Sequence, residues 1–211
     1  MIAIIDYQMG NVGSIRNMFR KVGATSVVTS DPEAIAAASK IVLPGVGAFD
    51  AGMTRIRQMG LEAVLNEKVL VQRTPILGIC LGMQLLTERS EEGDLPGLGW
   101  IEGETIRFRI EQKRHGLKVP HMGWNSIAAR RRDSLFRDLE DDAGFYFVHS
   151  YHVVCRNDAD VLATAHHEYD FVCAVERGNI MGTQFHPEKS HRYGMRVLKN
   201  FAELAYEAPH A

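Results

Sequence analysis

The sequence has little cysteine, no long apolar run and no surplus of charge of one sign. Three cysteines are too few, and odd in number, for a disulfide framework, so we expect a reducing compartment, the cytoplasm. No apolar stretch approaches the roughly 18 residues that a membrane-spanning helix needs, and Met1 to Asp6 lack the basic start of a signal peptide. The formal net charge of −2 argues against a nucleic-acid-binding protein, because such domains usually carry a basic surplus.

Signatures of nucleotide and metal sites are missing as well. No GxGxxG or Walker sequence follows a strand-like segment, which argues against a nucleotide-binding module. A metal site is an alternative because of His149, His152, His166 and His167. In a strand, however, His149 and His152 would lie on opposite faces, and no Cys-x-x-Cys or His-Glu-x-x-His spacing occurs. We therefore expect neither a metal nor another cofactor.

What the sequence does have is an alternation of short apolar strands and amphipathic helices. In the first half we predict strands at 2–5, 26–29, 40–43 and 76–79, and helices near 12–22, 50–58, 61–70 and 82–89. In the second half we predict strands at 105–109, 146–148, 152–155, 161–163, 172–175 and 179–184, loops at 90–104 and 111–125, and a long final helix. This pattern indicates an α/β fold with a mostly parallel central sheet, a more strand-rich second half and one domain over 1–211.

The most informative segment is Gly78-Ile79-Cys80-Leu81-Gly82-Met83-Gln84, which passes from a strand into a helix with Cys80 at the junction. This is the layout of a nucleophile elbow, in which small neighbours permit a sharp turn. The helix N-terminus favours the Cys80 thiolate, and the Leu81 amide would face an oxyanion on the acylated sulfur. The alternative is a buried small apolar residue, which is how we interpret Cys155 and Cys173.

A thiol nucleophile needs a base, and the base needs a group that orients it. His186 follows a predicted strand, and Glu188 stands two residues later. In extended backbone, which Pro187 would maintain, both side chains project the same way. A neighbouring carboxylate fixes the tautomer of an imidazole and stabilises its protonated form. His-x-Glu alone is a weak signal, but together with the elbow it predicts a Cys80-His186-Glu188 triad.

A third segment, Pro44-Gly45-Val46-Gly47, ends another predicted strand. Glycines let backbone approach a ligand closely, and a peptide that is free to reorient can supply a second oxyanion donor. The alternative is an ordinary turn. All three segments lie at the carboxyl ends of predicted parallel strands, where ligands bind in open α/β sheets.

These segments carry a resemblance to a known family. GICLGMQ at 78–84, PGVGAFD at 44–50 and HPEKS at 186–190 resemble the class I (triad) glutamine amidotransferases. Within that family, PHMGWN at 120–125, FVHSY at 147–151 and DYQMGN at 6–11 are similar to the glutaminase subunits of imidazole glycerol phosphate synthases. The similarity extends over essentially the whole chain and implies the flavodoxin-like class I fold.

The resemblance also implies a reaction and a set of site residues. Cys80 would attack the side-chain amide of L-glutamine, His186 would protonate the departing ammonia and then activate water, and Glu188 would orient His186. The implied oxyanion donors are amides of Leu81 and of the loop residues Val46 and Gly47. The implied glutamine pocket consists of Gly45, Gln84, Glu92, His149, Ser150 and Tyr151.

A separate partner follows from the same resemblance, because 211 residues hold a glutaminase and no domain that consumes ammonia. That partner would be a (β/α)₈-barrel cyclase subunit of histidine biosynthesis, joined in a heterodimer through Asn11, Trp124 and Lys189. By residue type alone, Trp124 fits a protein core equally well. Gln8 stands where the opening motif is expected to have glycine, so a paralogous subunit that serves a surface-sugar amidination is an alternative. A non-catalytic partner-binding scaffold is another, which the intact triad argues against.

Overall fold

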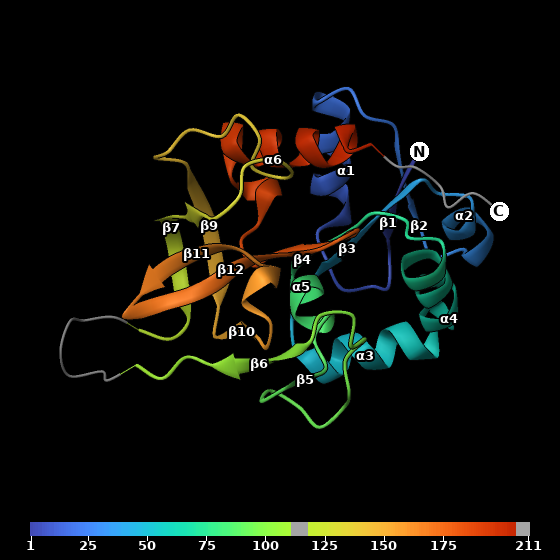
Figure 1. The fold of residues 1–211 in the computed structure, drawn as a ribbon. Helices are drawn as coiled ribbons and strands as arrows, with labels where there is room; N and C mark the ends of the chain where they lie inside the picture. The colour runs from blue at the N-terminus through green and yellow to red at the C-terminus, as the bar shows by residue number, and fades with distance from the viewer. Residues whose placement is uncertain (111–117, 206–211) are drawn as a thin grey trace.

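The computed structural model describes residues 1–110 and 118–205, which are built around one large twisted sheet (Figure 1). Its parallel part runs in the order β2 (Ser26–Thr29), β1 (Ile2–Ile5), β3 (Lys40–Gly45), β4 (Ile76–Cys80) and β13 (Ile180–Thr183). It continues through β12 (Tyr169–Arg177), β10 (Tyr151–Cys155) and β6 (Gly103–Arg107), each antiparallel to the strand before it, to the short β5 (Arg89–Ser90). The predicted α/β fold with a mostly parallel sheet and a strand-rich second half is confirmed.

Further strands extend the second half. β11 (Val161–His167) pairs with β12 and with the short β8 (Ala128–Ala129). β7 (His121–Ser126) and β9 (Gly144–His149) form a separate antiparallel pair beside the main sheet, visible at its far end in Figure 1.

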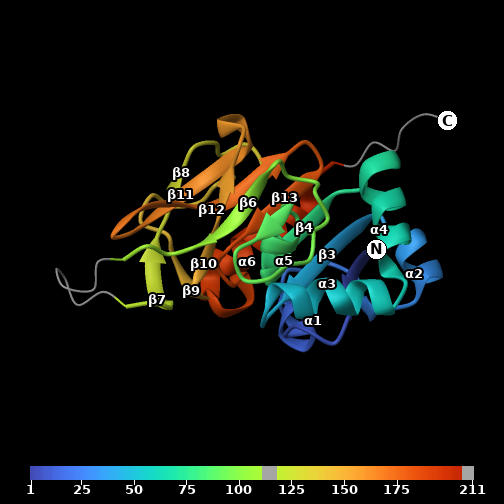
Figure 2. The same ribbon diagram turned by 90° about the horizontal axis from the view of Figure 1, so that it is seen from below.

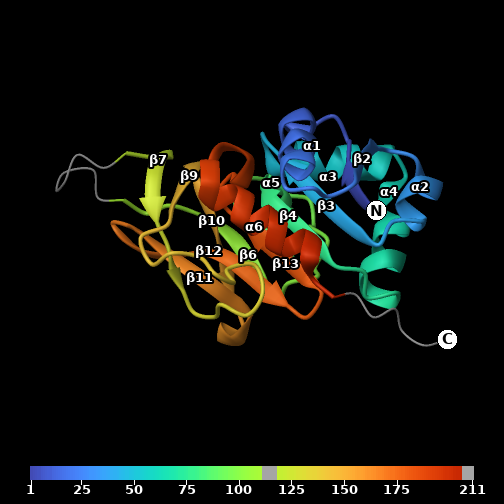
Figure 3. The same ribbon diagram turned by 90° about the horizontal axis from the view of Figure 1, so that it is seen from above.

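Helices cover both faces of the parallel part. α1 (Val12–Lys21) and α6 (His191–Glu203) lie on one face, in front of the sheet in Figure 3. α2 (Pro32–Ala36), α3 (Phe49–Gln58), α4 (Leu61–Asn66) with its π-helical continuation Glu67–Val71, and α5 (Leu81–Leu85) cover the other face, which Figure 2 shows. Strand alternation divides the core accordingly: Ile2 and Ile4 pack with the first group, and Ala3 and Ile5 with the second. No helix in the described ranges is long and apolar enough to cross a membrane.

Three predictions about the fold are wrong. The helix predicted over 82–89 ends at Leu85, because the amides of Leu98, Trp100 and Ile101 donate to the carbonyls of Leu85 and Leu86, where the next helical turn would have bonded.

The loop predicted over 111–125 contains β7, a strand that sequence reasoning missed because its residues include His, Gly and Asn, which favour strands weakly. Residues 111–117 of that loop lie outside the described ranges. The loop predicted over 90–104 likewise includes Ser90 of β5 and the first residues of β6.

Candidate active site

Cys80 occupies a strained turn between β4 and α5. Its φ of 55° and ψ of −111° lie in a region that residues other than glycine rarely adopt. The flanking glycines are required sterically, because a Cβ at Gly82 would collide with the carbonyl oxygen of Leu43, and one at Gly78 would lie 2.7 Å from the carbonyl oxygen of Gly82. The Cys80 side chain therefore stands at the carboxyl end of the sheet with α5 beginning at the next residue.

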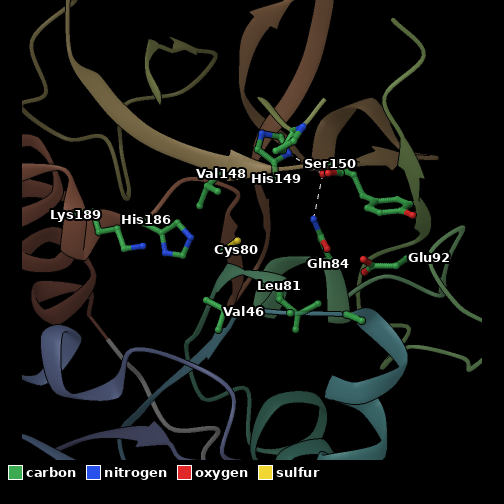
Figure 4. Close-up of a pocket in the computed structure, with 14 residues that line it drawn as sticks. Val46, Cys80, Leu81, Gln84, Glu92, Val148, His149, Ser150, His186 and Lys189 are labelled. Atoms are coloured by element: carbon green, nitrogen blue, oxygen red, sulfur yellow. Dashed lines mark hydrogen bonds between the residues drawn. The ribbon is translucent and has the colours of Figure 1, made fainter. Parts of the chain in front are cut away.

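His186 and Glu188 lie beside Cys80. Nδ1 of His186 donates to Oε1 of Glu188 at 2.8 Å, and the two side chains are only 2% and 1% exposed. Nε2 of His186 is buried, and the imidazole lies next to the Cys80 sulfur in Figure 4. The expected extended backbone is wrong beyond His186: Pro187–Lys189 form a 3₁₀ turn, for which proline at the first position is suited. The turn still brings the carboxylate to the imidazole.

The surroundings of His186 favour its protonated form. Burial by itself would lower the pKa of this imidazole. Hydrogen bonding and charge from Cys80 and from Glu188 act in the opposite direction and prevail, raising the pKa of His186 to about 9. At neutral pH the site thus holds a proton on the imidazole, ready to be given to a leaving group.

A cavity of about 490 Å³ opens over Cys80. Figure 4 shows His186 and Gln84 on opposite sides of the cysteine, with Glu92 farther along the same wall as Gln84. Oε2 of Glu92 accepts a hydrogen bond of 2.9 Å from the Phe49 amide at the start of α3. Burial raises the pKa of Glu92, and the Phe49 amide opposes that rise. The lining residues are Val46, Gly47, Ala48, Cys80, Leu81, Gln84, Glu92, Pro120, Val148, His149, Ser150, Tyr151, His186 and Lys189.

The floor of the cavity next to Cys80 is the end of β3. This strand runs two residues beyond its predicted end, and Gly45 pairs in register with Cys80. Val46 follows with 44% of its surface exposed, and Gly47 has a φ of +101°, which favours glycine. Gly45 itself lies against the Tyr7 hydroxyl, which a Cβ would approach to 2.5 Å. Val46 and Gly47 line the same cavity as Leu81 at the start of α5, whereas Gly45, predicted for the glutamine pocket, is not among the lining residues.

Comparison with known proteins decides the family. The profile of the family described as glutamine amidotransferase class-I matches residues 3–204. The chain belongs to the class I glutamine amidotransferases. A Methanococcus maripaludis protein named imidazole glycerol phosphate synthase subunit HisH 2 is 51% identical over 205 residues, 97% of this chain and 100% of that protein. The Pseudomonas aeruginosa protein of the same name is 47% identical over 204 residues, again 97% and 100%.

Solved structures support the fold alone, because their sequences are distant. The crystal structure of one glutamine amidotransferase superimposes with a TM-score of 0.72 at 17% identity, covering 96% of this chain and 99% of the other. A glutamine amidotransferase from Thermotoga maritima gives 0.63 at 20% identity, covering 94% of this chain and 80% of the other.

This amidotransferase contains a polar residue at the site that sequence reasoning missed. Gln184, directly after β13, is fully buried, and its Nε2 lies 3.8 Å from the Cys80 sulfur. Its Oε1 accepts a hydrogen bond of 3.0 Å from Nε2 of Gln84. The available signal was its position two residues before His186, which in extended backbone puts both on one side.

The prediction that His149 and His152 lie on opposite faces of one strand is wrong. They belong to different strands, β9 and β10, and both pack against Phe108, with ring centroids 5.2 and 4.7 Å away. Within the described residues, no three His, Cys, Asp or Glu side chains are placed to hold a metal ion.

The residues predicted for a partner interface are exposed. Trp124 is 52% exposed and stacks on His191 at 5.2 Å with an interplanar angle of 6°. Lys189 lines the cavity, and its Nζ lies 5.5 Å from the ring centre of Tyr146. Asn11 caps the start of α1 by accepting from the Ser14 amide.

Gln8, the departure from the expected opening motif, has a φ of 67°, the conformation in which glycine is favoured. The backbone shape expected of glycine is therefore kept with glutamine in its place.

Proposed function

We propose that this chain is the glutaminase subunit of an imidazole glycerol phosphate synthase, with residues 1–211 forming a single domain. It hydrolyses L-glutamine through a Cys80 thioester and supplies ammonia to a (β/α)₈-barrel cyclase subunit in histidine biosynthesis. The observation that carries the proposal is that Cys80 and His186 line one cavity, with Glu188 hydrogen-bonded to His186. The relatives named as HisH subunits, which match 97% of this chain over their own full length, support the choice of synthase.

The first half of the reaction releases ammonia. The Cys80 sulfur attacks the side-chain carbonyl carbon of glutamine, and the carbonyl oxygen becomes an oxyanion. The amides of Leu81 and of Val46 or Gly47 hold that oxyanion, since both backbone segments border the cavity beside the sulfur. The Nε2 proton of His186 passes to the nitrogen of the breaking C–N bond, ammonia departs, and a glutamyl thioester is left on Cys80.

The second half regenerates the enzyme. His186, now neutral, takes a proton from a water molecule at Nε2 while the water oxygen attacks the thioester carbon. The C–S bond breaks, glutamate leaves, and the thiolate and imidazolium are restored. Glu188 keeps Nδ1 protonated through both halves, so that Nε2 is the nitrogen that exchanges protons.

The far wall of the cavity suits the amino-acid end of the substrate. One oxygen of Glu92 is engaged by the Phe49 amide, and the carboxylate lines the cavity, where it can meet the ammonium group of glutamine. His149, Ser150 and Tyr151 also line the cavity, and backbone amides there would suit the carboxylate of glutamine.

The proposal is tested with a glutamine-analogue electrophile such as a diazo-ketone. We expect it to label Cys80 alone, because burial raises the pKa of Cys155 to about 12 and that of Cys173 still further, leaving both as unreactive thiols. We also expect slow glutamine hydrolysis by the isolated chain and faster hydrolysis when the barrel subunit is present with its nucleotide. Labelling of Cys155, or activity that survives Cys80→Ala, contradicts the proposal, and an inert but partner-binding chain supports the scaffold alternative.

A paralogous role is the second candidate, in which ammonia goes to a cyclase-like partner that amidinates a bacterial surface sugar. Gln8 favours it as a departure from the expected motif. The partner that co-purifies with the chain, assayed with the histidine-pathway nucleotide, distinguishes the two acceptors.

A further inference from the structure

Gln184 is a buried polar group whose position the triad chemistry does not explain. It is completely shielded from solvent, yet its carboxamide is turned toward the nucleophile, with Nε2 3.8 Å from the Cys80 sulfur. The titratable groups that face Cys80 are His186, which follows β13, and Tyr7, which follows β1. Gln184 is a third polar neighbour and a neutral one, so it acts on the sulfur as a hydrogen-bond donor or as an acceptor according to which way its amide is turned.

The orientation of the Gln184 amide is settled by its neighbours. The carbonyl oxygen of Tyr151 can only accept, so the Gln84 atom that lies 3.1 Å from it is the amide nitrogen. The same nitrogen of Gln84 lies 3.0 Å from Gln184, and because it donates there as well, the Gln184 atom that receives it is Oε1. Nε2 of Gln184 is then the atom that faces the sulfur, with an N–H to donate.

The Tyr151 carbonyl, which fixes the orientation of the Gln84 amide, is itself held in place by hydrogen bonding. Nδ1 of His149 donates to it at 2.7 Å, which leaves Nε2 of His149 to accept from Nδ1 of His121 at 3.0 Å. Nε2 of His121 accepts in turn from the Asn125 amide at 3.2 Å. Burial lowers the pKa of His121 to about 4 and that of His149 to about 3, so both rings are neutral and each has one donor and one acceptor. The donor and acceptor roles are therefore fixed along the whole chain of hydrogen bonds from Asn125 to Gln184.

We propose that Gln184 is a catalytic residue that donates a hydrogen bond to the Cys80 sulfur and stabilises its thiolate, and that Gln84 holds the Gln184 amide in the donating orientation. This inference deepens the glutaminase function proposed above and rests on Cys80 being its nucleophile. A hydrogen bond to the charged form of a group favours that form.

The test measures the rate of Cys80 alkylation by iodoacetamide as a function of pH, an assay that needs no glutamine turnover and so stands apart from the proposed function. Gln184→Met keeps the length of the side chain and removes the N–H. We expect the midpoint of the alkylation profile to rise by about one pH unit, so that alkylation below the midpoint is roughly tenfold slower. Thr183→Val is the matched control, because it removes a neighbouring buried hydrogen bond, from Oγ1 to the Phe185 carbonyl, which does not reach the sulfur. Its midpoint should equal that of the wild type.

A second measurement covers the case in which Gln184→Met does not fold. In the wild-type protein labelled with ¹⁵N-glutamine, one buried side-chain amide signal should titrate together with the thiolate absorbance, and that titration should be missing in Cys80→Ala. An unchanged midpoint in Gln184→Met, an equal shift in Thr183→Val, or no titrating amide signal in the wild type overturns the proposal.

Discussion

Substituting Glu188 by glutamine isolates the contribution of one buried charge. The carboxylate is 1% exposed and receives the Nδ1–H of His186 at 2.8 Å. A glutamine side chain has the same length, and its carbonyl oxygen can accept the same proton, so the tautomer of His186 is kept. What is lost is the negative charge beside the imidazolium. Glu188→Gln therefore tests whether that charge, rather than the shape of the site, sustains the chemistry.

The magnitude follows from the burial of the pair. Hydrogen bonds to charged groups contribute about 1.5–3 kcal/mol, and one pKa unit corresponds to about 1.4 kcal/mol. We therefore expect the pKa of His186 to fall from about 9 by roughly one to two units. The imidazolium that gives up its proton in the first half of the proposed reaction, and forms again in the second, loses the same stabilisation, so kcat should fall roughly tenfold to hundredfold while KM changes little.

Folding stability gives an independent readout with a defined sign. A histidine whose pKa is raised by folding adds stability that is fully present below its unfolded pKa of about 6.5 and is lost as pH rises through the folded value of about 9. The difference in unfolding free energy between wild type and Glu188→Gln should thus be largest on the acid side of neutrality and vanish in alkaline solution.

The assay combines NMR titration of the His186 ring with steady-state glutaminase kinetics in the presence of the barrel subunit. Glu104→Gln is the control, because Glu104 forms an ion pair with Arg89 on the surface. A His186 midpoint that stays near 9 in Glu188→Gln, or an unchanged kcat, refutes the reasoning.

Three further outcomes are expected. Gly82→Ala should lower the unfolding free energy by about 3 kcal/mol or more in urea titration, because its Cβ would collide with the Leu43 carbonyl; a loss below about 1 kcal/mol contradicts the steric account. Acidification should destabilise the protein by about 1.4 kcal/mol per pH unit for each of His121 and His149 as pH falls below about 6.5, since only the unfolded chain then binds their protons; an unchanged urea midpoint there rules it out. Trp124→Ala should weaken binding of the barrel subunit by roughly 2 kcal/mol in calorimetry and leave the isolated chain equally stable; undiminished affinity excludes Trp124 from the interface.

Sequence patterns predicted the elements whose structure depends on their own residues, and missed those whose limits depend on distant contacts. The apolar β-branched run at Ile2–Ile5 became β1 without change of boundary, because a strand buried on both faces needs nothing beyond such a run. The length predicted for the helix after Cys80 was wrong because the helix is ended by a later loop, whose amides donate to the carbonyls of Leu85 and Leu86. β7 was missed for the same kind of reason. It is a strand despite its composition because it pairs with β9, where His121 stands opposite His149.

The residues of the site also separate into those that local sequence patterns predicted and those that they missed. Cys80, His186 and Glu188 were predicted together because each has a local signature, a glycine-flanked turn or a two-residue spacing at a strand end, and parallel strands deliver those ends to one edge. Gln184 has only its two-residue spacing from His186, and His121 has no local signature. Their roles depend on which carbonyl or amide stands opposite them, as with the Tyr151 carbonyl that turns the Gln84 amide. That information exists only once β9, β10 and β13 are assembled.

The two halves of the molecule meet at His186, the base in the proposed mechanism, which explains why a partner is expected to change its reactivity. The His186 amide donates to the Tyr146 carbonyl of β9 at 2.9 Å, so the position of the base depends on a strand outside the parallel sheet. The ring of that same Tyr146 packs against Trp124 at 6.2 Å and lies under the Lys189 ammonium. A protein that binds the exposed Trp124 therefore contacts the neighbour of Tyr146, whose backbone carbonyl positions the His186 amide. Movement of β9 by a fraction of an ångström would alter the approach of Nε2 to the Cys80 sulfur, to which a proton-transfer rate is sensitive.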